Sequence, residues 1–130
     1  MSNRVVAHFI DGRVLKGASF DVSPTKATCH VQTSTGSVDV RLSELKALFV
    51  VKDLTGDPAR QEGRTILAGD TRAVGARRVE ICFKDGEQLV GLMPSYRPEQ
   101  QFFYILPADS GSNNIRILIN RAATSSVQVP

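Results

Sequence analysis

The chain has 130 residues, of which 42% are hydrophobic and 22% are charged, as is ordinary for a globular protein. No apolar run approaches the roughly 20 residues of a membrane helix, and the N-terminus lacks the long apolar segment of a secretory signal. The two cysteines, Cys29 and Cys82, are too few for a disulfide framework. We therefore expect a cytoplasmic protein without a membrane segment.

The net charge of +3 is unevenly distributed along the chain. Residues 1–52 carry seven Lys/Arg against four Asp/Glu, residues 53–76 carry three against four, and residues 77–130 carry six against five. The positive excess therefore lies in the first part of the chain, and it forms no basic run. Nucleic-acid binders usually have clustered basic residues, so the charge pattern does not favour that class.

One pattern occurs twice, with a constant offset, in 5–17 and in 79–91. Each copy has an alternating apolar strand, an Asp-Gly pair and a second strand that contains a glycine. An Asp-Gly pair between such strands is a strong signal for a tight hairpin, because glycine tolerates a positive φ. The two turns are formed by Asp11-Gly12 and Asp85-Gly86. We expect a sharp bend or a positive φ at the strand glycines, Gly17 and Gly91.

Further short strands follow in both copies. In the first copy they are expected at residues 28–31, 38–42 and 47–51, and in the second at 102–106, 115–119 and 127–129. Segment 53–76 is rich in glycine and polar residues and is predicted to be a linker, in which only residues 65–67 form a strand. The sequence thus predicts an all-β protein of two tandem five-stranded barrels, of the Sm-like or SH3-like type. Their expected bounds are 1–52 and 77–130.

The two copies differ on the outer face of the first strand. Val6, His8 and Ile10 stand where the second copy has Glu80, Cys82 and Lys84. The last strand of the first copy, Leu48-Phe49-Val50-Val51, is also apolar on both faces. We therefore expect the outer face of the first copy to pack against the second copy or against a second chain. The residues predicted for this interaction surface are Val6, Ile10, Phe49 and Val51.

The stretch from Val6 to Asp21 resembles the first Sm motif of Sm-like proteins. The resemblance rests on the alternating apolar residues, on Asp11-Gly12-Arg13, on Gly17 and on Phe20-Asp21. In that family, the Asp and an Asn four residues later help to hold a base of single-stranded RNA. Here Asp21 is present, but Thr25 stands at the Asn position, and the Arg-Gly pair of the second Sm motif is absent. The resemblance implies the fold of each copy and not a working RNA site.

The two-copy arrangement as a whole resembles an uncharacterised family of bacterial proteins. Members of that family share Phe-x-Asp-Gly-x-x-x-x-Gly in each half and the Val51-Lys52-Asp53 that ends the first copy. This resemblance covers nearly the whole chain and implies no known activity.

Residues 20–23 resemble the Asp-x-Ser-x-x-Gly motif of PilZ domains, which bind cyclic di-GMP. Lys26 stands at the glycine position of that motif. PilZ domains also have an Arg-x-x-x-Arg before it, whereas the chain has this spacing after it. The resemblance implies a nucleotide site made by Asp21, Ser23, Arg60 and Arg64.

The chain has no sequence motif for catalysis or metal binding. It lacks a Gly-x-Ser-x-Gly elbow and a glycine-rich phosphate loop. Cys29 and His30 point to opposite faces of a strand, so they cannot share one metal ion unless the strand has a bulge. We expect no catalytic residue, no metal and no cofactor. The predicted function is a non-enzymatic regulatory or protein-interaction module that binds a protein partner or itself, and the alternative is an RNA- or nucleotide-binding module.

Overall fold

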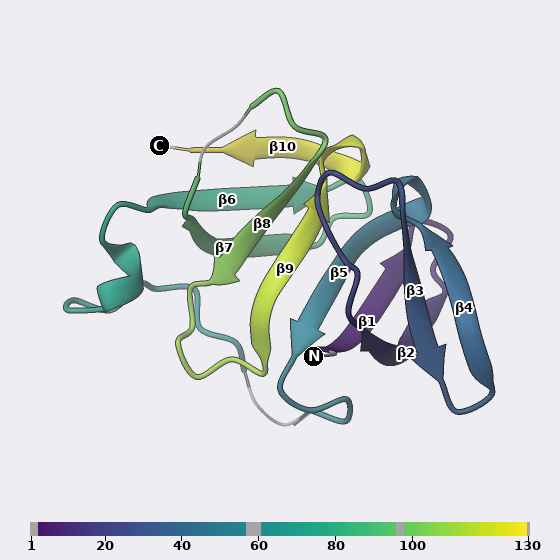
Figure 1. Ribbon diagram of the computed structural model, residues 1–130. Coiled ribbons are helices and arrows are strands. Elements are labelled where there is room, and N and C mark those ends of the chain that lie inside the picture. Colours follow the sequence, from purple (N-terminus) through teal and green to yellow (C-terminus); the bar gives the residue numbers. More distant parts are fainter. Residues whose placement is uncertain (1–2, 57–60, 96–97, 130) are drawn as a thin grey trace.

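The structure is a computed structural model that describes residues 3–56, 61–95 and 98–129 (Figure 1). The prediction of an all-β protein is confirmed. The first half contains five strands: β1 (Asn3–Phe9), β2 (Val14–Ser19), β3 (Thr28–Thr33), β4 (Gly36–Arg41) and β5 (Leu45–Val51). The second half contains β6 (Arg77–Phe83), β7 (Gln88–Met93), β8 (Phe102–Pro107), β9 (Asn114–Asn120) and β10 (Thr124–Gln128). The short 3-10 helices are η1 (Leu42–Glu44), η2 (Thr71–Ala73) and η3 (Arg121–Ala123).

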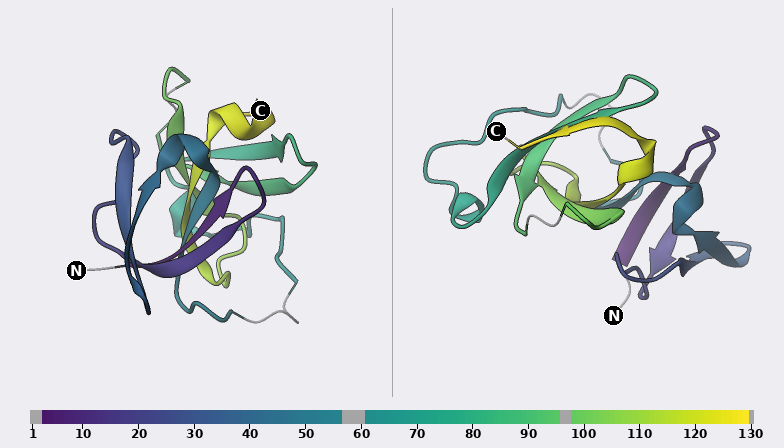
Figure 2. Two further views of the ribbon diagram at one scale, coloured as in Figure 1. Left: turned by 90° about the vertical axis from the view of Figure 1, so that its right-hand side faces the viewer. Right: turned by 90° about the horizontal axis from the view of Figure 1, so that it is seen from above.

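All ten strands belong to one antiparallel sheet with the order β10-β6-β7-β8-β9-β5-β1-β2-β3-β4. Within each half the order is the same: fifth strand, first, second, third and fourth. The two halves are joined by the pairing of β5 with β9, which lie side by side in the middle of the molecule (Figure 1). The strands of each half curve strongly, as the view from above shows (Figure 2).

The two Asp-Gly hairpins have matching geometry. In the first, the Phe9 amide donates to the Arg13 carbonyl at 2.9 Å and the Gly12 amide donates to the Phe9 carbonyl at 3.1 Å. Asp11 Oδ1 accepts from the Arg13 amide at 3.0 Å. Gly12 has a φ of +96°, as does its counterpart Gly86. The same three hydrogen bonds recur in the second hairpin among Phe83, Asp85, Gly86 and Glu87.

Gly17 and Gly91 are needed for a reason that the sequence did not predict. Neither is among the positive-φ glycines of the described chain, so of the two expectations, a sharp bend or a positive φ, the positive φ is wrong. Instead, a Cβ at Gly17 would overlap the carbonyl oxygen of Gln32, and one at Gly91 would overlap the carbonyl oxygen of Leu106. Glycine is therefore needed at these two positions because the second strand crosses the third at very close range.

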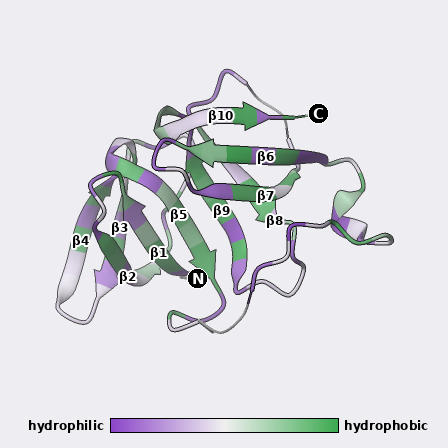
Figure 3. Ribbon diagram, turned by 180° about the vertical axis from the view of Figure 1, so that it is seen from behind, coloured by the Kyte–Doolittle hydropathy of each residue, from purple (hydrophilic) through white to green (hydrophobic). Residues whose placement is uncertain are grey.

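β5 contributes alternate side chains to two separate cores. Leu48 and Val50 belong to the core of the first half, with Val5, Ala7, Cys29 and Val31 among its members. Ala47, Phe49 and Val51 point the other way and complete the core of the second half, with Ile81, Phe83, Ile105 and Ile117. Because a strand's side chains alternate between faces, one strand can seal both cores. Figure 3 accordingly shows β5 as mostly hydrophobic.

The described part of the predicted linker lies against the second half. Its residues 65–67 form no strand, so that prediction is wrong. The Gly63 amide donates to Asp109 Oδ2 at 2.9 Å, and Ser112 Oγ donates to Glu62 Oε2 at 2.6 Å. Arg72 Nη1 donates to the Pro107 carbonyl at 2.9 Å. Side-chain hydrogen bonds thus fix this segment to the β8–β9 loop without adding a strand to the sheet.

Candidate functional site: a cleft between the two halves

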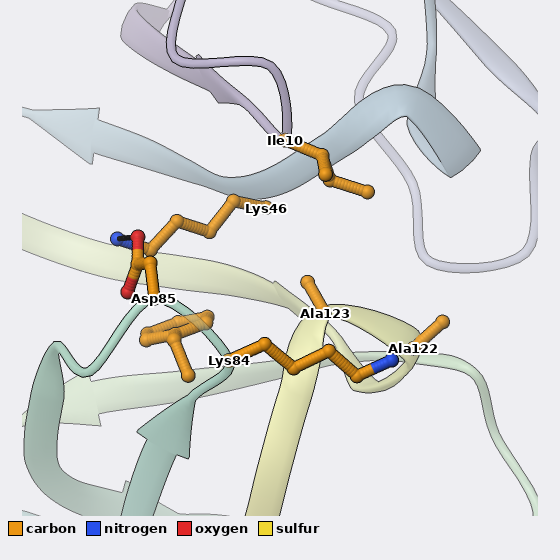
Figure 4. A pocket seen from close by; sticks show the side chains of 7 residues that line it. Ile10, Lys46, Lys84, Asp85, Ala122 and Ala123 are labelled. Carbon is orange, nitrogen blue, oxygen red and sulfur yellow. Dashed lines mark ion pairs between the residues drawn. The ribbon is translucent and has the colours of Figure 1, made fainter.

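A cleft of about 370 Å³ lies where the first hairpin tip meets the second half (Figure 4). Ile10 and Lys46 contribute the first-half wall. The opposite wall and the floor come from the end of β6, the second Asp-Gly turn and η3, namely Phe83, Lys84, Asp85, Ala122 and Ala123. Both halves must therefore be in place for the cleft to exist.

Equivalent hydrogen bonds hold the two hairpins at the cleft. The Ile10 amide donates to the Glu44 carbonyl of η1 at 2.9 Å, and the Lys84 amide donates to the Ala123 carbonyl of η3 at 3.0 Å. Ile10 and Lys84 occupy the same place in the two copies, since each directly precedes the Asp of its Asp-Gly turn. The difference between the copies at this place therefore puts an isoleucine and a lysine on facing walls of one cleft (Figure 4).

Lys46 connects the two halves by charge. Its Nζ lies 2.7 Å from Asp85 Oδ2, also pairs with Glu87, and stands 4.7 Å from the centre of the Phe83 ring. Burial lowers the pKa of Lys46, but the hydrogen bonds to Asp85 and Glu87 outweigh it, and the net pKa is raised. The hydrogen bond from Lys46 in turn lowers the pKa of Asp85. Lys46 therefore forms a charged link between the two halves.

The rest of the cleft combines apolar surface with one available cation. Ile10 is 58% exposed, whereas Phe83, which lines the same cleft, is 2% exposed. Within the described part of the chain, the Lys84 ammonium has no ion-pair partner, so it can form an ion pair with a carboxylate of a binding partner. These features suit an apolar side chain that has an acidic neighbour.

The predicted interaction surface is covered at three of its four residues. Phe49 and Val51 are buried against the second half, and Val6 packs against the same cluster while partly exposed. The His8 ring also lies edge-on to Phe49, with 4.8 Å between ring centroids. Ile10 is not buried against the second copy, because it lies at the hairpin tip, where it lines the cleft and is 58% exposed. Its packing against a second chain stays a prediction.

Replacement of Ile10 by lysine is therefore expected to leave the folded state intact. An exposed substitution away from a core changes the free energy of unfolding by within about 0.5 kcal/mol. Val5→Lys, at a fully buried position of β1, is the matched control and should unfold the protein. Denaturant melts of both variants provide the measurement. A loss of several kcal/mol for Ile10→Lys would show that the cleft is closed in solution.

Asp21 and Ser23 lie in the loop after β2, far along the sheet from Arg64. Asp21 Oδ1 accepts from Ser19 Oγ at 3.0 Å and from the His30 amide at 2.9 Å. Ser23 contacts Thr25, and Arg64 Nη1 donates to Gln88 at the start of β7 at 3.4 Å. Arg60 lies outside the described residues. The structure thus does not bring Arg64 to Asp21, as the predicted nucleotide site would require.

A histidine is held between two carboxylates beside this loop. His30 Nδ1 lies 2.6 Å from Asp21 Oδ2, and Nε2 lies 3.3 Å from Asp39 Oδ1. The side-chain hydrogen bond to His30 is the main cause that lowers the pKa of Asp21 to about 2. The same hydrogen bond raises the pKa of His30 above its ordinary 6.5.

The two histidines are expected to titrate on opposite sides of pH 6.5. Burial lowers the pKa of His8, whereas the bond to Asp21 raises the pKa of His30. The His30 contribution to stability is therefore present below pH 6.5 and is lost as the pH rises through its folded pKa. The His8 effect has the opposite sign, since protonation of His8 disfavours the folded state. An NMR titration of the imidazole protons will resolve both groups.

Asp21→Asn is the informative variant for that titration. It should move the His30 pKa down towards 6.5 and leave that of His8 unchanged, because His8 does not contact Asp21. Equal shifts of both histidines, or a His30 pKa below 6.5 in the unaltered protein, would contradict the arrangement of His30 between Asp21 and Asp39.

Comparison with known proteins gives a family for the chain. A family model described as "Family of unknown function (DUF6982)" matches residues 1–130. The chain belongs to this family. Searches of curated proteins and of solved structures found no match. Among the described residues of this DUF6982 chain, no helix is long and apolar enough to cross a membrane, and no group of three potential metal ligands occurs.

Sequence reasoning did not single out Lys46, Lys84, Ala122 and Ala123 as cleft residues. Two signals were available in the sequence. Lys46 is the only charged residue between Leu45 and Val51, and Lys84 replaces an isoleucine of the other copy. Neither signal shows that the two lysines lie in one cleft, because that depends on how the halves of the DUF6982 chain are joined.

Proposed function

We propose that this DUF6982 protein is a non-enzymatic module of two small Sm-like or SH3-like barrels that binds a protein partner in the cleft between them. The repeated strand order and the two cores support the two-barrel interpretation. The observation that carries the function is the exposed Ile10 above an apolar floor, beside the available ammonium of Lys84. The partner segment is expected to present an apolar side chain next to a carboxylate.

The ionised groups at the cleft favour binding over catalysis. Lys46 and Asp85 neutralise each other in an ion pair, and no nucleophile stands next to a general base among the described residues that line the cleft. The two free cysteines fit a reducing compartment, which is consistent with a cytoplasmic protein. A regulatory role follows if the partner's activity changes when the cleft is occupied.

Photocrosslinking in the native cell tests this proposal. A photoreactive phenylalanine analogue at Ile10 should crosslink one protein partner, and Lys84→Glu should reduce that crosslink about tenfold or more through charge repulsion. The matched control position is Val74, which is 85% exposed but lies away from the cleft. Equal crosslinking from both positions, or no effect of Lys84→Glu, would overturn the proposed site.

The same experiment distinguishes the alternative function. Phe20 is 68% exposed beside Asp21, and an exposed aromatic ring can stack on a base of single-stranded RNA or on a nucleotide. The alternative would be favoured over protein binding if RNA or a nucleotide is recovered with the protein and three results hold. Its binding should be lost in Phe20→Ala, should weaken steeply as salt rises, and should be unchanged in Lys84→Glu.

A further inference from the structure

The two edge strands of the sheet are the repeat equivalents of the two strands that join the halves. Inside the chain, β9, the fourth strand of the second half, pairs with β5, the fifth strand of the first half. The strands left unpaired on one side are β4 and β10, which are the fourth strand of the first half and the fifth strand of the second. A second copy could therefore add head to tail by repeating the internal contact. Contacts of this kind generate rings or filaments.

Strand register shows which residues of β4 correspond to those of β9. Tyr104 pairs with Leu118 in the second half. His30, which the repeat offset aligns with Tyr104, pairs with Asp39 in the first half. Asp39 therefore occupies the position of Leu118, and His30 occupies the position of Tyr104.

The same comparison aligns β10 with β5. Ala7 pairs with Leu48, and Ile81, which the repeat offset aligns with Ala7, pairs with Val127. Val127 therefore occupies the position of Leu48. It follows that the next residue, Gln128, occupies the position of Phe49, and that Ser126 occupies the position of Ala47.

At the internal junction, the outer face of β8 and β9 is apolar. Leu118 is 2% exposed and belongs to the first-half core, against which Tyr104 also packs. In a repeated contact, Asp39 would be buried in the same way against Val127 of another copy. Its side chain is now 82% exposed and lies 3.3 Å from His30. Burial of that carboxylate would cost far more free energy than the new strand pairing contributes.

The β10 edge lacks apolar surface in the same way. Phe49 is 8% exposed and fills the second-half core at the junction. Gln128 would have to fill the corresponding place next to Val38 and Val40 of another copy, where neither valine side chain can hydrogen-bond its amide. Both edges thus have a polar residue where the internal contact has a buried apolar side chain, Leu118 or Phe49.

We propose that Asp39 and Gln128 prevent a second copy from repeating the internal junction, so that the chain acts as a single two-half unit. Charged and polar residues on an edge strand are a common protection against edge-to-edge pairing. The internal junction has no such protection because it is sealed within one chain. A second copy is therefore not expected to add to the sheet through these edges.

Two complementary variants test this proposal. The first carries His30→Tyr and Asp39→Leu and so has an apolar β4 face, and the second carries Ser126→Ala and Gln128→Phe and has an apolar β10 face. Each alone should remain a monomer of about the 14.1 kDa chain mass, because its other edge is unchanged. An equimolar mixture should form a one-to-one complex of twice that mass in size-exclusion chromatography with light scattering. A chain with all four substitutions should form larger head-to-tail assemblies.

The mixing experiment distinguishes specific strand pairing from non-specific association. Either variant mixed with the unaltered protein is the control and should stay monomeric. Circular dichroism must show that both variants are folded, and Asp39→Val with Gln128→Leu is the milder pair if they are not. The proposal is overturned if the unaltered protein is already oligomeric, if one variant alone self-associates, or if two folded variants fail to form the complex.

Discussion

Phe49→Ala is expected to lower the free energy of unfolding by about 3–5 kcal/mol, the range for removal of a buried aromatic side chain. Phe49 is 8% exposed and lies in the core of the second half although it belongs to a strand of the first. Its loss leaves a cavity at the junction and weakens both halves. Domains of this size are stable by only about 5–15 kcal/mol, so the variant should be measurably less stable in denaturant melts.

Phe20→Ala is the matched control, because it removes the same side chain from a position that is 68% exposed. It should change stability by within about 0.5 kcal/mol. Since β5 seals both cores, the unaltered protein and Phe49→Ala should each unfold in one transition, in which both halves lose structure together. A loss below about 1 kcal/mol for Phe49→Ala, or two separate transitions, would mean that the halves are not joined through β5.

Gly17→Ala and Gly91→Ala are expected to be the most damaging conservative substitutions outside the junction. Each new methyl group would overlap a main-chain carbonyl oxygen, and at Gly17 it would also lie 2.7 Å from Val31 Cγ1. A backbone atom in a paired strand cannot move aside without breaking its pairing. Overpacking costs typically 1–3 kcal/mol, and we expect about 3 kcal/mol or more here.

Gly12→Ala separates the close-approach explanation from backbone strain. Gly12 has a φ of +96°, but a Cβ there would meet nothing within 4 Å. Its cost is that of an alanine in a left-handed turn, about 1–2 kcal/mol. Thermal melts should therefore rank Gly17→Ala as more destabilising than Gly12→Ala. The reverse order would show that β2 and β3 are further apart than the structure has them.

The internal junction also determines what the candidate cleft can bind. Lys46 belongs to β5 but forms ion pairs with Asp85 and Glu87 of the other half. Among the described residues of the cleft, this leaves Lys84 as the cation that is available to a partner. If the halves separated, Ile10 and Lys84 would no longer face each other. Loss of partner binding in Phe49→Ala, in a preparation that is still folded, would be the expected functional consequence.

The predicted interaction surface shows how far local patterns reach. Phe49 and Val51 alternate with Leu48 and Val50 in a run that is apolar on both faces, and such a run predicts burial on both sides. Ile10 continues the same alternation from β1, yet it stands at the hairpin tip, where no neighbouring strand extends far enough to cover it. A period of two predicts which face a side chain points to, but not whether anything lies against that face.

The sequence by itself determined the all-β class and the two matching hairpins, because Asp-Gly turns and alternating strands depend on interactions between residues close in the chain. The repeat also identified Gly17 and Gly91 as special positions. Glycine is needed there because the main chain of Gln32 or Leu106 approaches closely, and no local pattern contains that contact. Only the tertiary structure decided that β5 pairs with β9, since strands from opposite halves of the chain meet through long-range packing. The cleft, the Lys46 link and the polar free edges all follow from that single pairing.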